Sequence, residues 1–325
     1  MGRLRIGVLG CADIAVRRML PAMAASARVE LVALASRRPE RAAEVAGQYG
    51  CRAVSGYAAL LRDPEVQAVY VPLPAALHAE WVERSLRAGK HVLAEKPLTT
   101  RYEQTAALLG LARSCGKVLM ENVMFVHHPQ HSAVRRLLDS GVIGELRFFR
   151  AEFTVPRRPA GDIRHEPQLG GGALWDTAVY PVRAALHLLG HDLAVVAAVL
   201  SRGGQDRVDT AGAALLRTAD GVSAQLAFGL DHGYRSVYEL CGSEGRITVE
   251  HAFTPPADHC PVLRLEGRYG SEDVVLKAAD QVALALDGFA AAVRAGSGPA
   301  DVYRRQAAVL DEVLTAATAQ RRRSD

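Results

Sequence analysis

Apolar runs and helical segments alternate over the first 122 residues, and this alternation constrains the fold more than any other feature of the sequence. The apolar runs have the length of buried strands and lie at residues 4–10, 29–36, 68–74, 91–97 and 117–122. Segments with helical spacing separate them, at residues 13–26, 38–50, 78–88 and 101–115. Strands and helices in regular succession predict a parallel, doubly wound sheet.

The pattern changes after residue 122, and the chain of 325 residues is too long for one ordinary core. Helices are expected at 128–141, 173–189, 281–295 and 302–320, and a long alternating strand at 145–155. Strand-like runs fill 192–278, with a hairpin at Ala219-Asp220-Gly221. We predict an α/β protein with a Rossmann domain at 1–122 and a second α/β domain at 123–325, built on a large, mostly antiparallel open sheet with helices on one face.

The composition is that of an ordinary globular protein, with 49% hydrophobic and 23% charged residues. The net charge of +4 is too small to indicate nucleic-acid binding, and no apolar stretch is long enough to span a membrane. The five cysteines form no Cys-x-x-Cys pair, and the chain enters its first strand pattern without a signal peptide. These features predict a cytoplasmic protein with reduced thiols.

The turn after the first apolar run carries a dinucleotide-binding pattern. Residues 10–15 read Gly-Cys-Ala-Asp-Ile-Ala and fit Gly-x-Gly-x-x-Ala, with Ala12 in place of the middle glycine. Such a turn brings backbone N–H groups and a helix N-terminus against a pyrophosphate. An ordinary tight turn between strand and helix is the alternative, but the succession of strand, helix and strand favours the dinucleotide.

The end of the second strand distinguishes the two nicotinamide cofactors. NAD enzymes usually place an acid there, which accepts a hydrogen bond from the ribose 2′-hydroxyl. This chain has Ser36, Arg37 and Arg38 instead, a hydroxyl and two guanidiniums that suit a 2′-phosphate. The alternative is that the arginines merely begin a surface helix. We predict NADP (NADPH when reduced) as the cofactor.

Two further motifs carry candidate catalytic groups. Lys96 follows Glu95 at the carboxyl end of a buried strand, and Pro97 makes the next peptide bond a candidate for cis geometry. A glycine run at 170–172 precedes Asp176 and Tyr180, which one helix would present on the same face. Alternatively, Lys96 extends to solvent, Tyr180 packs in a helix core and Asp176 caps the helix.

These motifs together resemble the Gfo/Idh/MocA oxidoreductase family: Gly-x-Ala after the first strand, Glu-Lys-Pro, then Gly-Gly-Gly followed by Asp-x-x-x-Tyr. Many members have His where Tyr180 stands. The stretches "GCADIA", "ENVMFVHHPQH" and "DIRHEPQLGGGAL" are especially similar to NADPH-dependent ketoreductases that act on nucleotide-linked deoxysugars in antibiotic biosynthesis. The resemblance implies a C-3 ketone reduction, with a small-molecule substrate that is expected to be a dTDP-linked keto sugar.

The resemblance also implies roles for individual residues. Tyr180 would give the proton, and Lys96 would polarise the carbonyl and lower the pKa of the phenol, although these roles can be exchanged. Asp176 would orient a sugar hydroxyl or hold Lys96. The candidate cofactor-binding residues are Gly10, Cys11, Ala12, Asp13, Ile14, Ser36, Arg37, Arg38, Leu73, Pro74, His78, Glu95, Lys96, Asn122, Arg164 and Gln281.

Four residues are candidates for substrate binding: Glu121, His128, Arg157 and Arg158. The arginines suit a diphosphate, with solvated loop charges as the alternative. His127, His128 and His131 suggest a metal, but no acidic or Cys ligand is near in sequence, so no metal is predicted.

Two other functions stay open: an NADP-dependent dehydrogenase of a free sugar, inositol or dihydrodiol, and a non-catalytic NADP-sensing regulator. The open sheet of the second domain predicts a homodimer or homotetramer, because a broad face or edge needs a cover.

Overall fold

The computed structural model describes residues 2–204 and 206–324, with side chains as far as residue 320. The chain divides into two compact units, the first formed by Met1–Val123 with Val282–Arg304 and the second by Met124–Gln281 with Arg305–Asp325. The first division lies next to the expected boundary at 122/123. The segment 282–304, expected in the second domain, instead packs with the first unit, where Asp287 lies 3.7 Å from Arg28.

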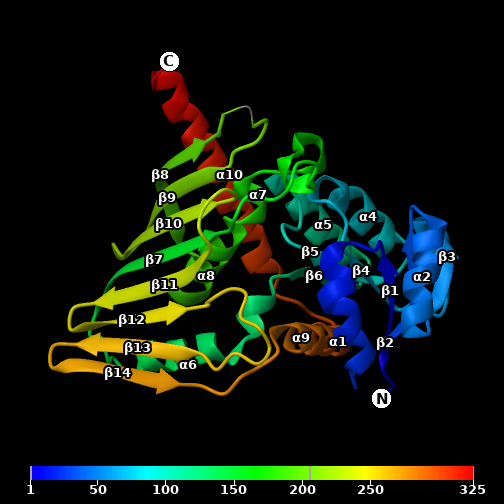
Figure 1. Ribbon diagram of the computed structural model, residues 1–325, viewed down its shortest axis with the longest axis horizontal. Helices are drawn as coiled ribbons and strands as arrows, with labels where there is room; N and C mark the ends of the chain where they lie inside the picture. Colours follow the sequence, from blue (N-terminus) through cyan, green and yellow to red (C-terminus); the bar gives the residue numbers. More distant parts are fainter. Residues whose placement is uncertain (1, 205, 325) are drawn as a thin grey trace. The chain divides into compact units, whose positions relative to one another are not determined.

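The first unit contains the expected doubly wound sheet, drawn in blue and cyan in Figure 1. Its six parallel strands have the order β3-β2-β1-β4-β5-β6. The strands are β1 Leu4–Leu9, β2 Val29–Ser36, β3 Arg52–Ser55, β4 Ala68–Val71, β5 His91–Glu95 and β6 Leu119–Asn122. The helices are α1 Leu20–Ala25, α2 Pro39–Tyr49, α3 Tyr57–Arg62, α4 Ala75–Arg87, α5 Tyr102–Ser114 and α9 Gln281–Ala295.

Five elements of this unit differ from the expectation. β3 and α3 had not been predicted, because β3 is an edge strand with mostly exposed residues and has no apolar run. The helix expected at 13–26 begins as a π-helix, Ala15–Met19, before α1. β4 ends three residues before its predicted end at 74, and β5 ends two residues before its predicted end at 97.

The second unit is built on an eight-stranded sheet of the order β14-β13-β12-β11-β7-β10-β9-β8. All neighbours are antiparallel except β7 and β10, so the sheet is mostly antiparallel as predicted. Its strands are β7 Leu146–Thr154, β8 Leu193–Ser201, β9 Ala211–Thr218, β10 Ser223–Gly229, β11 Arg235–Gly242, β12 Gly245–Glu250, β13 Val262–Gly267 and β14 Gly270–Val275. Helices α6 (Pro129–Asp139), α8 (Val179–Leu189) and α10 (Ala300–Ser324) lie on one face (Figure 1).

The helix expected at 173–189 is broken. α7 spans Ala173–Asp176, and α8 begins at Val179. At the break, the hydroxyl of Thr177 donates to the Ala173 carbonyl at 2.9 Å. Asp176 and Tyr180 therefore lie on successive helical segments, and the same-face spacing of one continuous helix does not apply to them.

Two features concern the chain as a whole. The five cysteines are free; Cys260 is exposed and the others are partly buried. None of the helices that the structure describes combines the length and apolar character needed to cross a membrane.

Candidate active site

Lys96 follows a strand end that a buried hydrogen-bond network fixes. The Glu95 carboxylate at the end of β5 accepts from the Tyr70 hydroxyl of β4 at 2.6 Å and from Asn122 Nδ2 of β6 at 2.7 Å. Burial raises the pKa of Glu95, and the two donors act in the opposite direction. Three neighbouring strands are thus joined directly beneath Lys96, and the Lys96–Pro97 bond is cis, as predicted.

The segment after Lys96 has two further supports. Glu121 Oε1 accepts from the Leu98 backbone N–H at 2.9 Å. The ring of His78, on α4, lies 2.8 Å from the Pro97 carbonyl oxygen and 2.7 Å from that of Leu73. A direct contact with a cofactor, expected for His78, would need an exposed ring atom, and the structure shows none.

The turn after β1 fits a dinucleotide. Gly10 has φ +123°, and a Cβ there would lie 3.2 Å from Leu73 Cδ2. A side chain would therefore fill the space through which a pyrophosphate approaches the backbone. Cys11 is partly buried, and Asp13 is exposed and forms an ion pair with Arg17.

The end of β2 is cationic and has no acid, as NADP requires. Ser36 Oγ accepts from the Arg38 backbone N–H at 3.2 Å, and α2 begins directly afterwards. Burial raises the pKa of the Tyr57 phenol, and the positive charge of Arg37 acts in the opposite direction. The Ser36 hydroxyl and the two guanidiniums can donate hydrogen bonds to a 2′-phosphate. The carboxylate with which NAD enzymes accept a hydrogen bond from the ribose 2′-hydroxyl is absent from positions 36–38.

In the second unit, Asp176 is held by Arg164 of the preceding loop. Arg164 Nε donates to Asp176 Oδ2 at 2.8 Å, and its Nη1 lies 3.1 Å from Asp162 Oδ1. The Asp176 carboxylate in turn raises the pKa of the guanidinium. Arg164, predicted as a cofactor ligand, thus already binds two acids, and Asp176 contacts this arginine instead of capping α8, whose N-cap is Ala178.

The Tyr180 ring packs on an aromatic cluster. Its centroid lies 4.3 Å from that of Phe153, 5.8 Å from Phe253 and 6.1 Å from Phe125. The ring is only partly buried. These rings come from β7 (Phe153), from the 3-10 helix Met124–His127 (Phe125) and from the loop after β12 (Phe253), and the sequence pattern did not connect any of them with Tyr180.

The glycine run owes its composition to close packing. A Cβ at Gly171 would lie 2.5 Å from the Arg164 carbonyl oxygen, and one at Gly172 would lie 2.5 Å from Asp209 Oδ1. Asp209 accepts from the Leu174 backbone N–H at 2.7 Å and so fixes the start of α7. Sequence analysis missed Asp209 and Tyr70, because an acid in a loop and a tyrosine in an apolar run carry no distinctive signal.

Comparison with known proteins identifies the family. Residues 4–123 match the model of an oxidoreductase family with an NAD-binding Rossmann fold, and residues 131–248 match the GFO/IDH/MocA C-terminal domain. The chain belongs to the GFO/IDH/MocA oxidoreductase family. It is 54% identical to a dTDP-3,4-didehydro-2,6-dideoxy-alpha-D-glucose 3-reductase of Streptomyces violaceoruber, over 97% of this chain and 95% of the relative. It is 52% identical to the enzyme of that name from Actinomadura kijaniata, over 97% and 96%.

A solved structure of a GFO/IDH/MocA relative is also similar. This is KijD10, a 3-ketoreductase from Actinomadura kijaniata in complex with NADP and TDP-benzene. The TM-score is 0.94 at 52% identity, and the match covers 97% of this chain and 98% of KijD10. The likeness therefore extends over both units of the family fold.

Three other predicted site residues, Arg157, Gln281 and Asn122, differ in how far their polar atoms are paired within the protein. Arg157, expected at a diphosphate, binds Asp206 at 2.6 Å and Asp231 at 2.9 Å, because its loop lies beside both acids. Gln281 Nε2 donates to the Phe253 carbonyl at 3.3 Å. Asn122 Oδ1 and Gln281 Oε1 are buried acceptors without a hydrogen-bond partner among the described residues, and neither is accessible from the surface.

The predicted histidines lie near His187 of α8; His128 and His131 are buried, and His127 and His187 are partly buried. His128 caps α6 by accepting from the Gln130 backbone N–H, and His131 Nδ1 lies 2.8 Å from the Tyr238 hydroxyl. Among the described residues, no three His, Cys, Asp or Glu side chains are grouped to hold a metal ion. Burial lowers the pKa of His127 and of His187 to about 4 in each case, and the positive charge of Arg183 acts in the same direction.

His127 and His187 predict acid-sensitive stability. Both histidines have a folded-state pKa of about 4, below the unfolded value of about 6.5. Their neutral forms therefore stabilise the fold above pH 6.5, and this stabilisation is lost as the pH falls towards 4. We expect each to lower the free energy of unfolding by about 2 kcal/mol between pH 7 and pH 5.

Urea unfolding at both pH values tests this expectation. His187→Gln, which stays uncharged, should show a smaller loss than the parent chain, while the same replacement at exposed His191 should change nothing. An equal loss in the His187 variant and the parent would contradict it.

Proposed function

We infer that the chain is an NADPH-dependent 3-ketoreductase that reduces the C-3 ketone of a dTDP-linked keto-deoxysugar. One observation carries this inference: identity of 52–54% over 97% of the chain with dTDP-3,4-didehydro-2,6-dideoxy-alpha-D-glucose 3-reductases. The chain also contains the motifs at Gly10, Lys96 and Tyr180, in this order. The function belongs to the biosynthesis of deoxysugars.

The chain offers a matching cofactor site. The turn at Gly10 would hold the pyrophosphate, and Ser36, Arg37 and Arg38 the 2′-phosphate. Bound NADPH supplies the hydride for the carbonyl carbon. Contacts of the other predicted cofactor residues stay proposals, and for Arg164 such a contact would require a change in its pairing with Asp162 and Asp176.

We propose that Lys96 and Tyr180 act on the same carbonyl oxygen. Tyr180 would give the proton to the developing alkoxide, while Lys96 would stabilise the negative charge; the reverse assignment is the alternative. The variants of KijD10 in solved structures support the pair, since the replaced lysine and tyrosine are separated by the same number of residues as Lys96 and Tyr180. Asp176, fixed by Arg164, would orient a sugar hydroxyl.

Substrate binding by Glu121, His128, Arg157 and Arg158 also stays a proposal. Glu121 and His128 are almost wholly buried, so contact with a sugar would require them to become accessible. Arg158 is exposed and is the more available of the two arginines. The cytoplasmic location rests on the free cysteines and is proposed on that ground alone.

The proposed function is tested by NADPH oxidation with a freshly generated dTDP-3-keto-6-deoxyhexose. Free 3-keto sugar and NADH are run beside it. Turnover that needs both NADPH and the dTDP-linked sugar is the expected result. Turnover of the free sugar alone would replace the proposal by a free-sugar dehydrogenase, and tight NADPH binding with no turnover would indicate the regulator.

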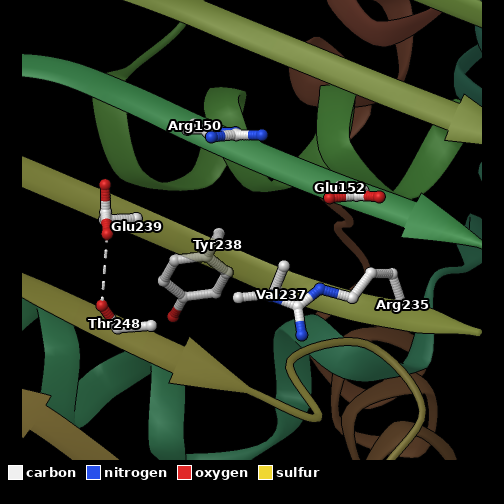
Figure 2. A pocket seen from close by; sticks show the side chains of 7 residues that line it. All are labelled: Arg150, Glu152, Arg235, Val237, Tyr238, Glu239 and Thr248. Atoms are coloured by element: carbon white, nitrogen blue, oxygen red, sulfur yellow. Dashed lines mark hydrogen bonds between the residues drawn. The ribbon is translucent and has the colours of Figure 1, made fainter.

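We also propose that the chain forms a homodimer or homotetramer through the face of the eight-stranded sheet opposite its helices. Figure 2 shows this face, where arginines and glutamates of β7 and β11 line a shallow pocket with Thr248 of β12. The strand register places exposed apolar side chains on the same face: Val199, Leu215, Val262 and Val275. Mixed charges with apolar margins suit a second copy, because a two-fold interface must complement itself.

A charge placed on this face should separate the copies. Leu215→Glu should lower the mass in solution to that of the single chain, because association would bury the new carboxylate without a partner. Light scattering after size-exclusion chromatography measures the mass. Tyr269→Glu, at an exposed turn between β13 and β14, is the matched control and should leave the mass unchanged. A single-chain mass for the parent would overturn the proposal.

A further inference from the structure

One buried histidine faces two acceptors at once. His78 Nδ1 lies 2.8 Å from the Pro97 carbonyl oxygen, and Nε2 lies 2.7 Å from the Leu73 carbonyl oxygen. A carbonyl oxygen can only accept, so both ring nitrogens have to donate. A neutral imidazole carries one N–H and would turn a lone pair towards the second oxygen. The two contacts together therefore fit an imidazolium.

The surroundings of the ring contain a counter-charge. The Glu121 carboxylate of β6, which accepts from the Leu98 N–H, is the charged group that acts on His78. Burial is the largest influence and lowers the pKa of His78, while the two carbonyl oxygens and Glu121 act in the opposite direction. A buried charge is retained more readily when an opposite charge acts on it and its donors are used. Glu121 supplies the opposite charge, and the two carbonyl oxygens lie within hydrogen-bond distance of both ring nitrogens.

The two carbonyls belong to segments of different function. The side chain of Leu73 lies against the turn at Gly10, where a Cβ would meet it at 3.2 Å. Pro97 directly follows Lys96, the proposed partner of the substrate carbonyl. His78 therefore links the wall of the nucleotide turn to the segment that carries the lysine, entirely within the first unit.

We propose that His78 is a positioning residue that, as an imidazolium, clamps the Lys96–Pro97 turn to the Leu73–Pro74 segment beside the nucleotide turn. These two hydrogen bonds of His78, called the clamp below, would determine the position of the Lys96 ammonium relative to a bound dinucleotide. This proposal rests on the proposed role of Lys96, and it adds a residue that touches neither cofactor nor substrate.

The first test compares two histidine variants. His78→Gln keeps one amide donor but cannot reach both carbonyls, so we expect kcat to fall about tenfold or more and the Kd for NADPH to rise, with KM for the sugar little changed. The control is His91→Gln at the opposite end of β5, where Nδ1 accepts from the Val118 N–H at 3.0 Å. It should lose stability to urea but keep kcat and Kd. Equal kcat values in the two variants would overturn the clamp.

The second test observes the ring itself. In the chain labelled with ¹⁵N-histidine, the resonances absent from His78→Gln belong to His78. Two ring nitrogens with the shift of an imidazolium at neutral pH would support the proposal, and the widely separated pair of a neutral imidazole would overturn it. If the parent chain shows no ketone reduction, the proposed function fails, while the ring spectrum and the Kd for NADPH still decide the clamp.

Discussion

Replacing Lys96 by Ala and Tyr180 by Phe together should lower kcat by at least about 10³-fold, since a positioned acid–base group alone contributes about 10²- to 10⁴-fold. The physical reason is that both changes remove the groups proposed to meet the developing alkoxide. Neither side chain belongs to the turn at Gly10 or to the cationic end of β2. The Kd for NADPH should therefore stay near that of the parent chain.

Matched controls separate chemistry from folding. Lys117→Ala removes a lysine just before the amino end of β6, whereas Lys96 follows the carboxyl end of β5. Tyr234→Phe removes an exposed hydroxyl that lies 2.7 Å from Thr254 Oγ1. The two controls together should keep the parent rate. A rate equal to the parent in the Lys96 and Tyr180 double variant, measured by NADPH oxidation, would remove both residues from the mechanism.

The second large effect concerns cofactor choice. Arg37→Ala with Arg38→Ala should lower kcat/KM for NADPH by about 10²-fold or more, because each charged hydrogen bond to a phosphate contributes about 1.5–3 kcal/mol. The value for NADH should be unaffected, since NADH has no 2′-phosphate. Adding Ser36→Asp should then raise kcat/KM for NADH, because the carboxylate can accept from the ribose hydroxyl.

The control for this series is Arg113→Ala, which removes an exposed arginine of α5 in the same unit. It should leave both cofactors as they are in the parent. Equal losses for NADPH and NADH in the Arg37 and Arg38 variant would show that these arginines support the fold instead of reading the phosphate.

The two sheets could be predicted from the sequence because buried strands leave continuous or alternating apolar runs. β2 was placed residue for residue at 29–36 by such a run. β3 escaped prediction because its residues Arg52–Ser55 are mostly exposed, so tertiary pairing with β2 decides its conformation.

The site could be predicted only as far as its motifs extend along the chain. Lys96 and Tyr180 lie in recognisable surroundings. The groups that fix them do not, because Tyr70 and Glu95 meet across two strands and Arg164 meets Asp176 across a loop. The break between α7 and α8 likewise depends on packing, since Asp209 reaches the backbone of Leu174 from far along the chain. Such contacts join residues whose separation along the chain follows no fixed pattern, so they cannot be predicted from sequence spacing.

The most direct test of the central claim follows the transferred hydride. NADPH carrying deuterium at the transferable position is incubated with the chain and a dTDP-linked 3,4-diketo-2,6-dideoxysugar, and the product is analysed by NMR and mass spectrometry. The account predicts one deuterium, bonded to C-3 of the sugar. Deuterium at C-4, or a sugar product without deuterium, would contradict it.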